Sequence, residues 1–300
     1  MNNKNKIKQS AVNRLFLVIS YIVTAFFAII CVLPFIMVVS GSLSNNDIVT
    51  VEGYSLIPKG FTLAAYQTIF RSAGTIIQAY KITILVTLAG TIGGVFITAM
   101  GGYVLSRKDF KYRNQVSMFV YFTSIFSGGM IPTFLIITKV LHMYDSIWAL
   151  ILPGMTGFFN IFLFRNFVNG IPDSLVESAR IDGAGDFTTF LKIIMPISKP
   201  AIATISLFTA LGYWNDWYRS SVYISDSSLY QLQYLLYKML LSVSDALKSA
   251  AASGGLIVDS LPTETLKLAT AVVSTGPVLL FYPFAQKYFV GGLTIGSVKG

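Results

Sequence analysis

The sequence predicts an all-α polytopic membrane protein with six transmembrane helices and both termini in the cytoplasm. Of the 300 residues, 54% are hydrophobic and 12% are charged, whereas an ordinary soluble domain is about 25% charged. Uncharged windows of about 20 residues, the length that a helix needs to cross lipid, recur along the chain. The Lys and Arg residues gather on one side of these windows. The composition excludes a soluble enzyme, a disordered chain and a fibrous protein.

Six windows are predicted to span the membrane. In chain order they are Leu15–Ser40, Ile82–Ser106, Asn114–Thr138, Ser146–Phe164, Pro200–Asn215 and Leu268–Gln286. The first window follows basic residues as a signal peptide would, but the apolar region of a signal peptide has only about 7–15 residues. The fifth window is short, and Lys199 can reach the interface beside it. The sixth contains Pro277 and Pro283, which spanning helices tolerate when neighbouring groups bind the freed carbonyls.

The charge distribution predicts the orientation. The N-terminus, the second and fourth loops and the C-terminus together carry 14 of the 22 basic and 5 of the 13 acidic residues, whereas the other side carries 8 of each. Basic loops stay in the cytoplasm, so both termini are expected there. The predicted divisions are a cytoplasmic tail (1–14), the first transmembrane helix (15–40), an extracytoplasmic segment (41–75), a transmembrane core (76–287) with a cytoplasmic loop at 165–199, and a cytoplasmic tail (288–300). Because topology explains the basic charge, no nucleic-acid partner is expected.

Small residues predict close packing in the second and third spans. Gly90, Gly94, Thr98 and Gly101–Gly102 form a ridge that lets helix backbones approach one another. In the third span, the string Ser127–Pro132 places two glycines before a proline and weakens the helix there. This bend is either a packing kink or part of a solute path.

Several kinds of site are excluded or disfavoured. The single Cys31 excludes an intramolecular disulfide and a Cys-cluster metal site, and the lone His142 disfavours zinc binding, so no metal site is expected. Ion-coupled carriers usually place Asp, Glu or His inside the bilayer, and no clear span contains one. A multi-pass enzyme would need a catalytic cluster, which is also missing. Gly291 and Gly296 have the outer spacing of a P-loop, but Ser297 stands where Lys is required.

The loop at 165–199 predicts two short helices around a glycine elbow. Ser174 and Glu177 fit a capping box at the start of the first helix, and Gly183 suits the left-handed position at its end. A second helix is expected over residues 187–195, ended by Pro196. The first helix is too short to be stable alone. It is therefore expected to dock onto its own bundle or into a cytoplasmic partner.

The same loop resembles the EAA signature of ABC importer permeases. That pattern is E-A-A, three residues, G, nine residues and I-x-L-P. Here it reads Glu177-Ser178-Ala179, Gly183 and Ile193-Ile194-Met195-Pro196 without a gap. Ser178 replaces an Ala and Met195 replaces a Leu, and both changes in volume are small. The string ESARIDGAGDFTTFLKIIMPISKP is most similar to the carbohydrate-uptake branch. The resemblance implies the type I ABC importer permease fold.

The likeness covers about residues 15–300. Further similar segments are Ile57–Thr62, Leu105–Arg107, Phe126–Thr133, Tyr213–Trp217, Phe281–Phe289 and Gly291–Gly300. The segment Phe126–Thr133 is similar to the oligosaccharide subgroup. The resemblance implies a multi-pass subunit of the inner or cytoplasmic cell membrane that forms half of a sugar path, beside a second permease subunit and membrane lipid. The same fold importing another solute, such as a peptide or phosphate, and an ion-coupled carrier are the alternatives.

The resemblance also implies which residues contact an ATPase subunit dimer. The expected coupling residues are Glu177, Ser178, Ala179, Asp182, Gly183, Ala184, Ile193 and Pro196. Glu177 either pairs with a basic residue of the ATPase or serves only as a helix cap. The C-terminal Lys299 and Gly300 either reach the ATPase dimer or lie in solvent. No cofactor is expected in this chain, because ATP and Mg belong to the ATPase partner, and no catalytic residue is expected.

The outer loops provide the remaining expectations. Apolar residues between Leu229 and Leu240 recur at helical spacing, and similar permeases use this region to contact an extracytoplasmic solute-binding protein. Sugars are held by aromatic faces with amide and hydroxyl partners. The candidates for the solute path are Ser127, Asn160, Trp214 and Asn215. Trp214 equally fits an interfacial aromatic belt, and Asn160 a hydrogen bond between helices.

Overall fold

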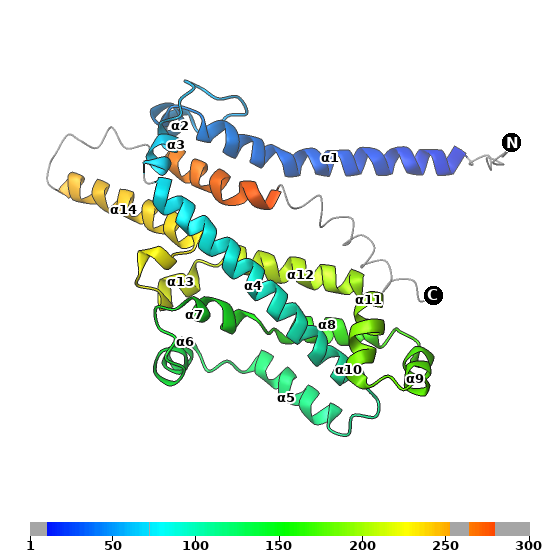
Figure 1. Ribbon diagram of the computed structural model, residues 1–300. Helices are drawn as coiled ribbons and strands as arrows, with labels where there is room; N and C mark the ends of the chain where they lie inside the picture. The colour runs from blue at the N-terminus through cyan, green and yellow to red at the C-terminus, as the bar shows by residue number, and fades with distance from the viewer. Residues whose placement is uncertain (1–10, 72, 253–263, 280–300) are drawn as a thin grey trace. The chain divides into compact units, whose positions relative to one another are not determined.

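The computed structural model describes residues 11–71, 73–252 and 264–279 (Figure 1). Every element assigned within these ranges is helical, which confirms the predicted all-α class. A helix satisfies its own backbone hydrogen bonds and so suits an apolar chain. The chain divides into two units, Met1–Arg71 with Ser242–Val273, and Ser72–Leu241 with Ser274–Gly300.

The first unit is built on one long helix. Its elements are α1 (Ala11–Ser42), α2 (Asn46–Glu52), α3 (Ala64–Phe70), the end of α14 (Leu232–Ala252) and the start of a helix over 264–279. The apolar side chains of α1, which covers the first predicted span, are exposed over most of its length. Asn46 joins distant parts of the unit, because its Oδ1 accepts hydrogen bonds from the N–H groups of Glu264 (3.0 Å) and Thr265 (3.4 Å).

The second unit is a bundle around α4. Its helices are α4 (Ala73–Ser106), α5 (Arg113–Ile125), α6 (Met130–Leu135), α7 (Ile147–Ile151), α8 (Phe158–Val168), α9 (Asp173–Ile181), α10 (Asp186–Thr189), α11 (Met195–Ile197), α12 (Lys199–Trp214), α13 (Tyr218–Tyr223) and the start of α14. Two π-helical turns (Ile136–Val140, Phe190–Ile194) and two 3-10 turns (Leu152–Gly154, Ser227–Leu229) complete it. The long α4 crosses the unit with α8 and α12 packed against it (Figure 1).

Glycines on α4 allow the close packing that the sequence predicts. A Cβ at Gly94 would lie 2.7 Å from the carbonyl oxygen of Met155, and one at Gly102 would lie 2.9 Å from a carbonyl oxygen of α8. A Cβ at Gly90 would overlap the ring of Tyr213. That ring is buried, and its hydroxyl donates a hydrogen bond of 2.6 Å to the carbonyl of Ile151. The small-residue ridge therefore fixes the distance between α4 and its neighbours.

The second and fifth predicted spans correspond to continuous helices. α4 ends at Ser106 as predicted, but it begins at Ala73 rather than Ile82. Lys81 interrupts a charge-free window without interrupting a helix, so the window locates the apolar part and not the helix start. α12, which runs from Lys199 to Trp214, differs by one residue at each end from the fifth window.

The third and fourth spans are bent pairs of helices rather than single straight ones. α5 and the segment Met130–Val140 meet at 112°, and Gly129 between them has φ +86°. The weakness predicted at Ser127–Pro132 is thus confirmed as a complete break. In the fourth span, the segments Ile147–Gly154 and Phe158–Val168 meet at 45°. Pro153 lies in the 3-10 turn, where it has no N–H for an α-helical hydrogen bond.

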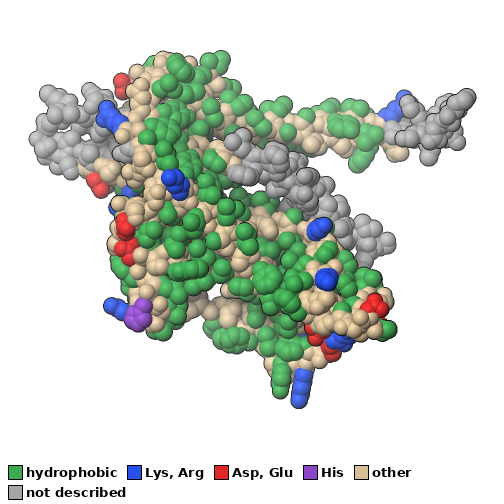
Figure 2. Space-filling model, viewed as in Figure 1, with side chains coloured by type: hydrophobic (Ala, Val, Ile, Leu, Met, Phe, Trp, Pro, Cys, Tyr) green, Lys and Arg blue, Asp and Glu red, His purple; other side chains and the backbone are tan. Residues whose placement is uncertain are grey.

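The count of six spans stays a prediction. Within the described residues, two helices are long and apolar enough to cross a membrane, or up to five if each bent pair is one span. The sixth window, Leu268–Gln286, extends beyond the described residues. The cytoplasmic placement of the termini is likewise a prediction. Hydrophobic side chains cover much of the visible face, and one group of charged side chains gathers where α9, α10 and the loop between α4 and α5 lie (Figure 2).

Candidate functional site

At the elbow between α9 and α10, backbone hydrogen bonds cap the C-terminus of α9. α9 ends at Ile181, and Gly183 adopts φ +81°. The N–H of Ala184 donates to the carbonyl of Ala179 (2.9 Å), and the N–H of Gly183 donates to the carbonyl of Arg180 (3.0 Å). These two hydrogen bonds form a Schellman motif. Because a Cβ is strained at this φ, the predicted left-handed conformation of Gly183 at the end of the helix is confirmed.

The predicted capping box at the start of α9 is wrong. The helix begins at Asp173, Pro172 occupies the N-cap position, and no side chain caps it. Pro172 fixes the chain in an extended conformation just before the helix, so Ser174 falls inside the first turn. The Asp173 carboxylate lies at the positive end of the helix dipole. Glu177 is therefore not needed as a cap, and its side chain is exposed.

The second helix of the loop also differs from the prediction. α10 begins at Asp186, after Gly185 as N-cap, and continues through the π-helical turn into α11, which ends at Ile197. Pro196 does not stop it: Pro196 is the second residue of α11, which directly follows the π-helical turn. The chain turns only after Ile197, where the segment Asp186–Ile197 and α12 meet at 83°.

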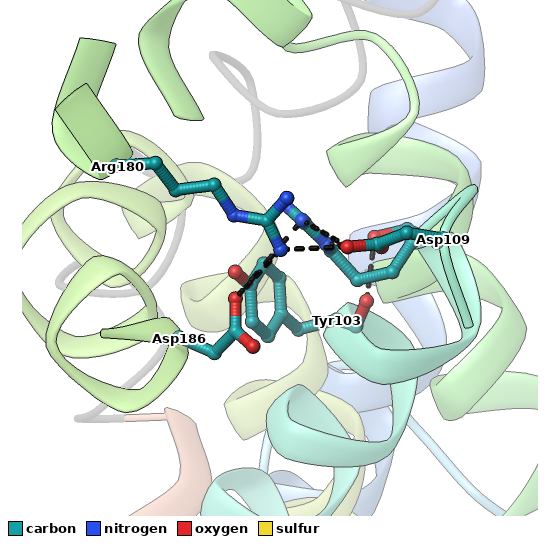
Figure 3. A network of polar contacts seen from close by, with 6 residues as sticks. Tyr103, Asp109, Arg180 and Asp186 are labelled. Atoms are coloured by element: carbon teal, nitrogen blue, oxygen red, sulfur yellow. Dashed lines mark hydrogen bonds and ion pairs between the residues drawn. The ribbon is translucent and has the colours of Figure 1, made fainter. Parts of the chain in front are cut away.

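A cluster of charged residues ties the elbow to the loop between α4 and α5. Arg107 donates through Nε (3.0 Å) and Nη2 (2.9 Å) to the Asp109 carboxylate. Arg180 on α9 donates to Asp109 (2.6 Å) and to Asp186 of α10 (3.2 Å), so that its guanidinium lies between the two carboxylates (Figure 3). We call Arg107, Asp109, Arg180 and Asp186 the Asp109 cluster. A separate ion pair joins Lys108 to Asp173 (2.6 Å) and ties the start of α9 to the same loop.

The electrostatics of the Asp109 cluster keep it ionised. The hydrogen bonds from Arg107 and then from Arg180 hold the pKa of the Asp109 carboxyl well below its usual range. Single exposed ion pairs contribute about 0–1 kcal/mol, and networks with two-pronged Arg–carboxylate geometry are the more effective ones. The Asp109 side chain is half exposed, so the cluster serves to orient the elbow more than to stabilise the fold.

Apolar packing anchors the loop from the other side. Phe190 and Ile194 of the π-helical turn are fully buried, and the Phe190 ring lies 5.5 Å from the ring of Tyr103 on α4. On α9, Ala179 is buried. Leu175 is 42% exposed and Ile181 is 87% exposed. The bundle of this chain therefore covers the face of α9 that carries Ala179 and leaves Leu175 and Ile181 exposed.

A cavity of about 610 Å³ lies between the elbow and the bundle. Residues from the end of α4, the start of α5, the end of α8 and α9 line it. Basic side chains are prominent in its wall, and Glu177 contributes a carboxylate. The cavity thus combines elements that are distant in the sequence but adjacent to the elbow.

The predicted coupling residues lie along α9, its C-terminal turn and the segment up to α11. Glu177, Ser178, Asp182, Gly183 and Pro196 are exposed, Ala184 and Ile193 are half-buried, and Ala179 is buried. Ala179 packs on this chain's own bundle, so its small size serves that contact. The roles of Arg107, Asp109 and Arg180 were not foreseen. The signal for them is the charged run Arg107–Arg113 in a chain with few charges.

Within the described part of the chain, no hydrogen bond links the candidates for the solute path to one another. Ser127 and Asn215 are exposed. Asn160 on α8 donates a hydrogen bond of 3.4 Å to the hydroxyl of Thr209 on α12. Trp214 is buried, and its Nε1 donates to the carbonyl of Ser274 (3.0 Å). Lys299 and Gly300 lie outside the described residues. Among the described residues, no group of three or more His, Cys, Asp or Glu side chains could hold a metal ion.

Comparisons with known proteins agree with these features. The family described as "Binding-protein-dependent transport system inner membrane component" matches residues 90–291. The polygalacturonan/rhamnogalacturonan transport system permease protein YtcP of Bacillus subtilis is 44% identical over 96% of this chain and 99% of its own length. The arabinooligosaccharides transport system permease protein AraQ of Halalkalibacterium halodurans is 27% identical over 94% and 98%.

A solved structure supports the fold. A chain of a bacterial ABC transporter involved in the import of the acidic polysaccharide alginate has a TM-score of 0.77 and 30% identity, over 95% of this chain and all of that one. The family match covers more than half of the sequence and includes the elbow, the Asp109 cluster and the bundle around α4. This chain belongs to the family of binding-protein-dependent transport system inner membrane components.

Proposed function

We propose that this chain is a permease subunit of an ATP-driven importer of oligosaccharides. Family membership supports a transport subunit rather than an enzyme. The observation that carries the coupling role is the elbow itself, where Ala179 is buried against the bundle while Leu175 and Ile181 stay exposed. An exposed side chain such as Ile181 gains from burial against another protein.

The ATPase partner is proposed from the exposed side of α9, and the other partners from membership of the family. An ATPase dimer, which binds ATP and Mg, receives the elbow in the cytoplasm. A second permease subunit completes the solute path, and an extracytoplasmic solute-binding protein delivers the sugar to the opposite face. In this arrangement the chain is a multi-pass protein of the cell membrane with both termini in the cytoplasm.

The proposed mechanism is rigid transmission of movement. When the ATPase dimer closes on ATP, it displaces α9. The Asp109 cluster carries this displacement to the end of α4, and the buried Phe190 and Ile194 carry it toward α12. Two discrete packings of the bundle then alternate access to the solute path.

The names of relatives favour an acidic oligosaccharide as the first candidate. The 44% identical relative is named for polygalacturonan and rhamnogalacturonan, and the solved structure for alginate. Other relatives are named for arabinooligosaccharides and galactooligosaccharides. We therefore propose that oligogalacturonides are transported in preference to neutral oligosaccharides.

Binding-protein-stimulated ATPase activity of the reconstituted importer tests this proposal. Oligogalacturonides, neutral arabinooligosaccharides and short peptides are compared as ligands of the binding protein. The proposal expects stimulation by the acidic glycans and none by peptides. Stimulation by peptides with no response to any glycan would contradict the proposal. Stimulation by neutral glycans alone would contradict only the proposed preference for acidic oligosaccharides.

A further inference from the structure

The cavity beside the elbow contains two arginines that the ion-pair network leaves unpaired. Arg107 and Arg180 bind Asp109, and Lys108 binds Asp173. Arg113 and Arg165 line the same cavity, and within the described residues neither makes an ion pair. Of the three carboxylates in the lining, Asp109 and Asp173 are paired and Glu177 makes no ion pair among the described residues, so positive charge stays in excess.

The Arg165 side chain is held in place, but one of its hydrogen-bond donors has no acceptor. Its Nη1 donates to the hydroxyl of Ser117 on α5 (3.2 Å), and its Cζ lies 5.4 Å from the ring centroid of Phe162. Its Nε is buried and has no hydrogen-bond partner. A buried donor without an acceptor is unfavourable, and in native proteins such donors usually bind water or an ion. The geometry therefore provides a fixed guanidinium whose Nε lacks an acceptor.

Arg113 adds a positive charge at the N-terminus of α5. It is the first residue of that helix, whose N-terminal turn has neither an acidic residue nor a side-chain cap. The uncapped end adds the partial positive charge of the helix dipole. Further along α5, the row of residues spaced by three from Arg113 is apolar, with Val116 38% exposed and Phe119 68% exposed. A cationic pocket thus adjoins an open apolar helix face.

We propose that this cavity binds the phosphate headgroup of an anionic phospholipid, held by Arg113 and Arg165, with its acyl chains along α5. The volume of about 610 Å³ lies within the range of known ligand pockets, roughly 300–1,000 Å³. Basic pockets between helices at the cytoplasmic side commonly hold lipid headgroups. A free phosphate would use the two arginines but not the apolar face, which is why a lipid is favoured. The proposal rests on the cytoplasmic placement of the elbow in the proposed function.

A lipid at this position would act on coupling. The Arg165 side chain joins α8 to α5 through Ser117, and the cavity also includes residues of α9. A bound phosphate would neutralise the two arginines and bring these three helices together behind the elbow. The binding of α9 to an ATPase would then depend on the lipid composition of the membrane.

Lipid retention by the purified importer tests the proposal. The complex is isolated through a tag on this chain, and retained phosphatidylglycerol is compared with phosphatidylcholine by native mass spectrometry. Removing a cation weakens lipid binding about fivefold, so the double variant Arg113→Gln/Arg165→Gln should retain roughly 25-fold less phosphatidylglycerol. The charge-conserving variant Arg113→Lys/Arg165→Lys should keep most of it. Lys111→Gln, which removes a neighbouring charge outside the cavity, is the matched control.

Three outcomes would overturn the proposal. Unchanged retention in the double glutamine variant would remove the two arginines from lipid binding. Equal competition by soluble glycerol phosphate would assign the cavity to a free anion. Loss of a co-purifying ATPase with unchanged lipid would assign the arginines to the protein contact. If the double variant fails to fold, the single variant Arg113→Gln replaces it and should retain about fivefold less phosphatidylglycerol. A complex that retains lipid but contains no ATPase would contradict the proposed function and leave the lipid site standing.

Discussion

Replacing Gly183 by alanine isolates the strain at the elbow. Gly183 has φ +81°, and no atom lies within 4 Å of the position that a Cβ would occupy. The substitution therefore adds no clash, and its effect is the left-handed strain of about 1–2 kcal/mol. This strain should lower the equilibrium constant for the closed elbow by about 5- to 30-fold.

Hydrogen exchange at the amide of Ala184 measures this change. That amide donates to the carbonyl of Ala179 (2.9 Å) only while the elbow is closed. Its protection should fall about 5- to 30-fold in Gly183→Ala and by less in Gly183→Asn, since Asn tolerates this conformation. Gly185 is the matched control, because its φ of −69° accepts alanine and no atom lies within 4 Å of its Cβ position. Equal loss of protection in Gly183→Ala and Gly185→Ala would refute the reasoning.

Three further outcomes are expected. Asp109→Asn should speed exchange at the elbow more than Asp173→Asn, because Asp109 binds two guanidinium groups and Asp173 binds one ammonium group; the reverse order would contradict this. Gly94→Ala should destabilise the solubilised chain by about 1–3 kcal/mol in thermal unfolding, since its Cβ would lie 2.7 Å from a backbone oxygen, whereas Gly101→Ala, with its nearest contact at 3.8 Å, should change little. Because the folded pKa of Asp109 is lowered, its stabilisation is complete above the ordinary value of about 3.9 and is lost only as pH falls below that. Elbow protection, corrected for intrinsic exchange, should therefore stay constant from about pH 8 to about pH 5, and a steady loss over that range would count against the cluster.

Local chemistry explains what could be predicted from the sequence. The end of α9 was predictable because a glycine at a helix terminus has one common conformation. The start of α9 was mispredicted because Pro172 overrode the capping preference of Ser174, and two local signals competed there. The break at Gly129 was anticipated, but its angle of 112° depends on packing with other helices.

Long-range contacts were beyond the sequence. Asp109 and Arg180 are 71 residues apart, and no periodicity relates the loop after α4 to the end of α9. The same applies to Arg165 on α8 and Ser117 on α5, which are 48 residues apart. In the sequence, the charged members of these pairs contribute only to the charge on one side of the predicted membrane, and nothing indicates their partners.

Photocrosslinking at the elbow tests the central claim most directly. A photoreactive residue replaces Ile181, which is 87% exposed, or Val140, which is 68% exposed and predicted to lie on the opposite side of the membrane. The account predicts that position 181 crosslinks to a nucleotide-binding subunit in intact cells and that position 140 does not. Absence of any such crosslink at 181, or an equal yield at 140, would contradict it.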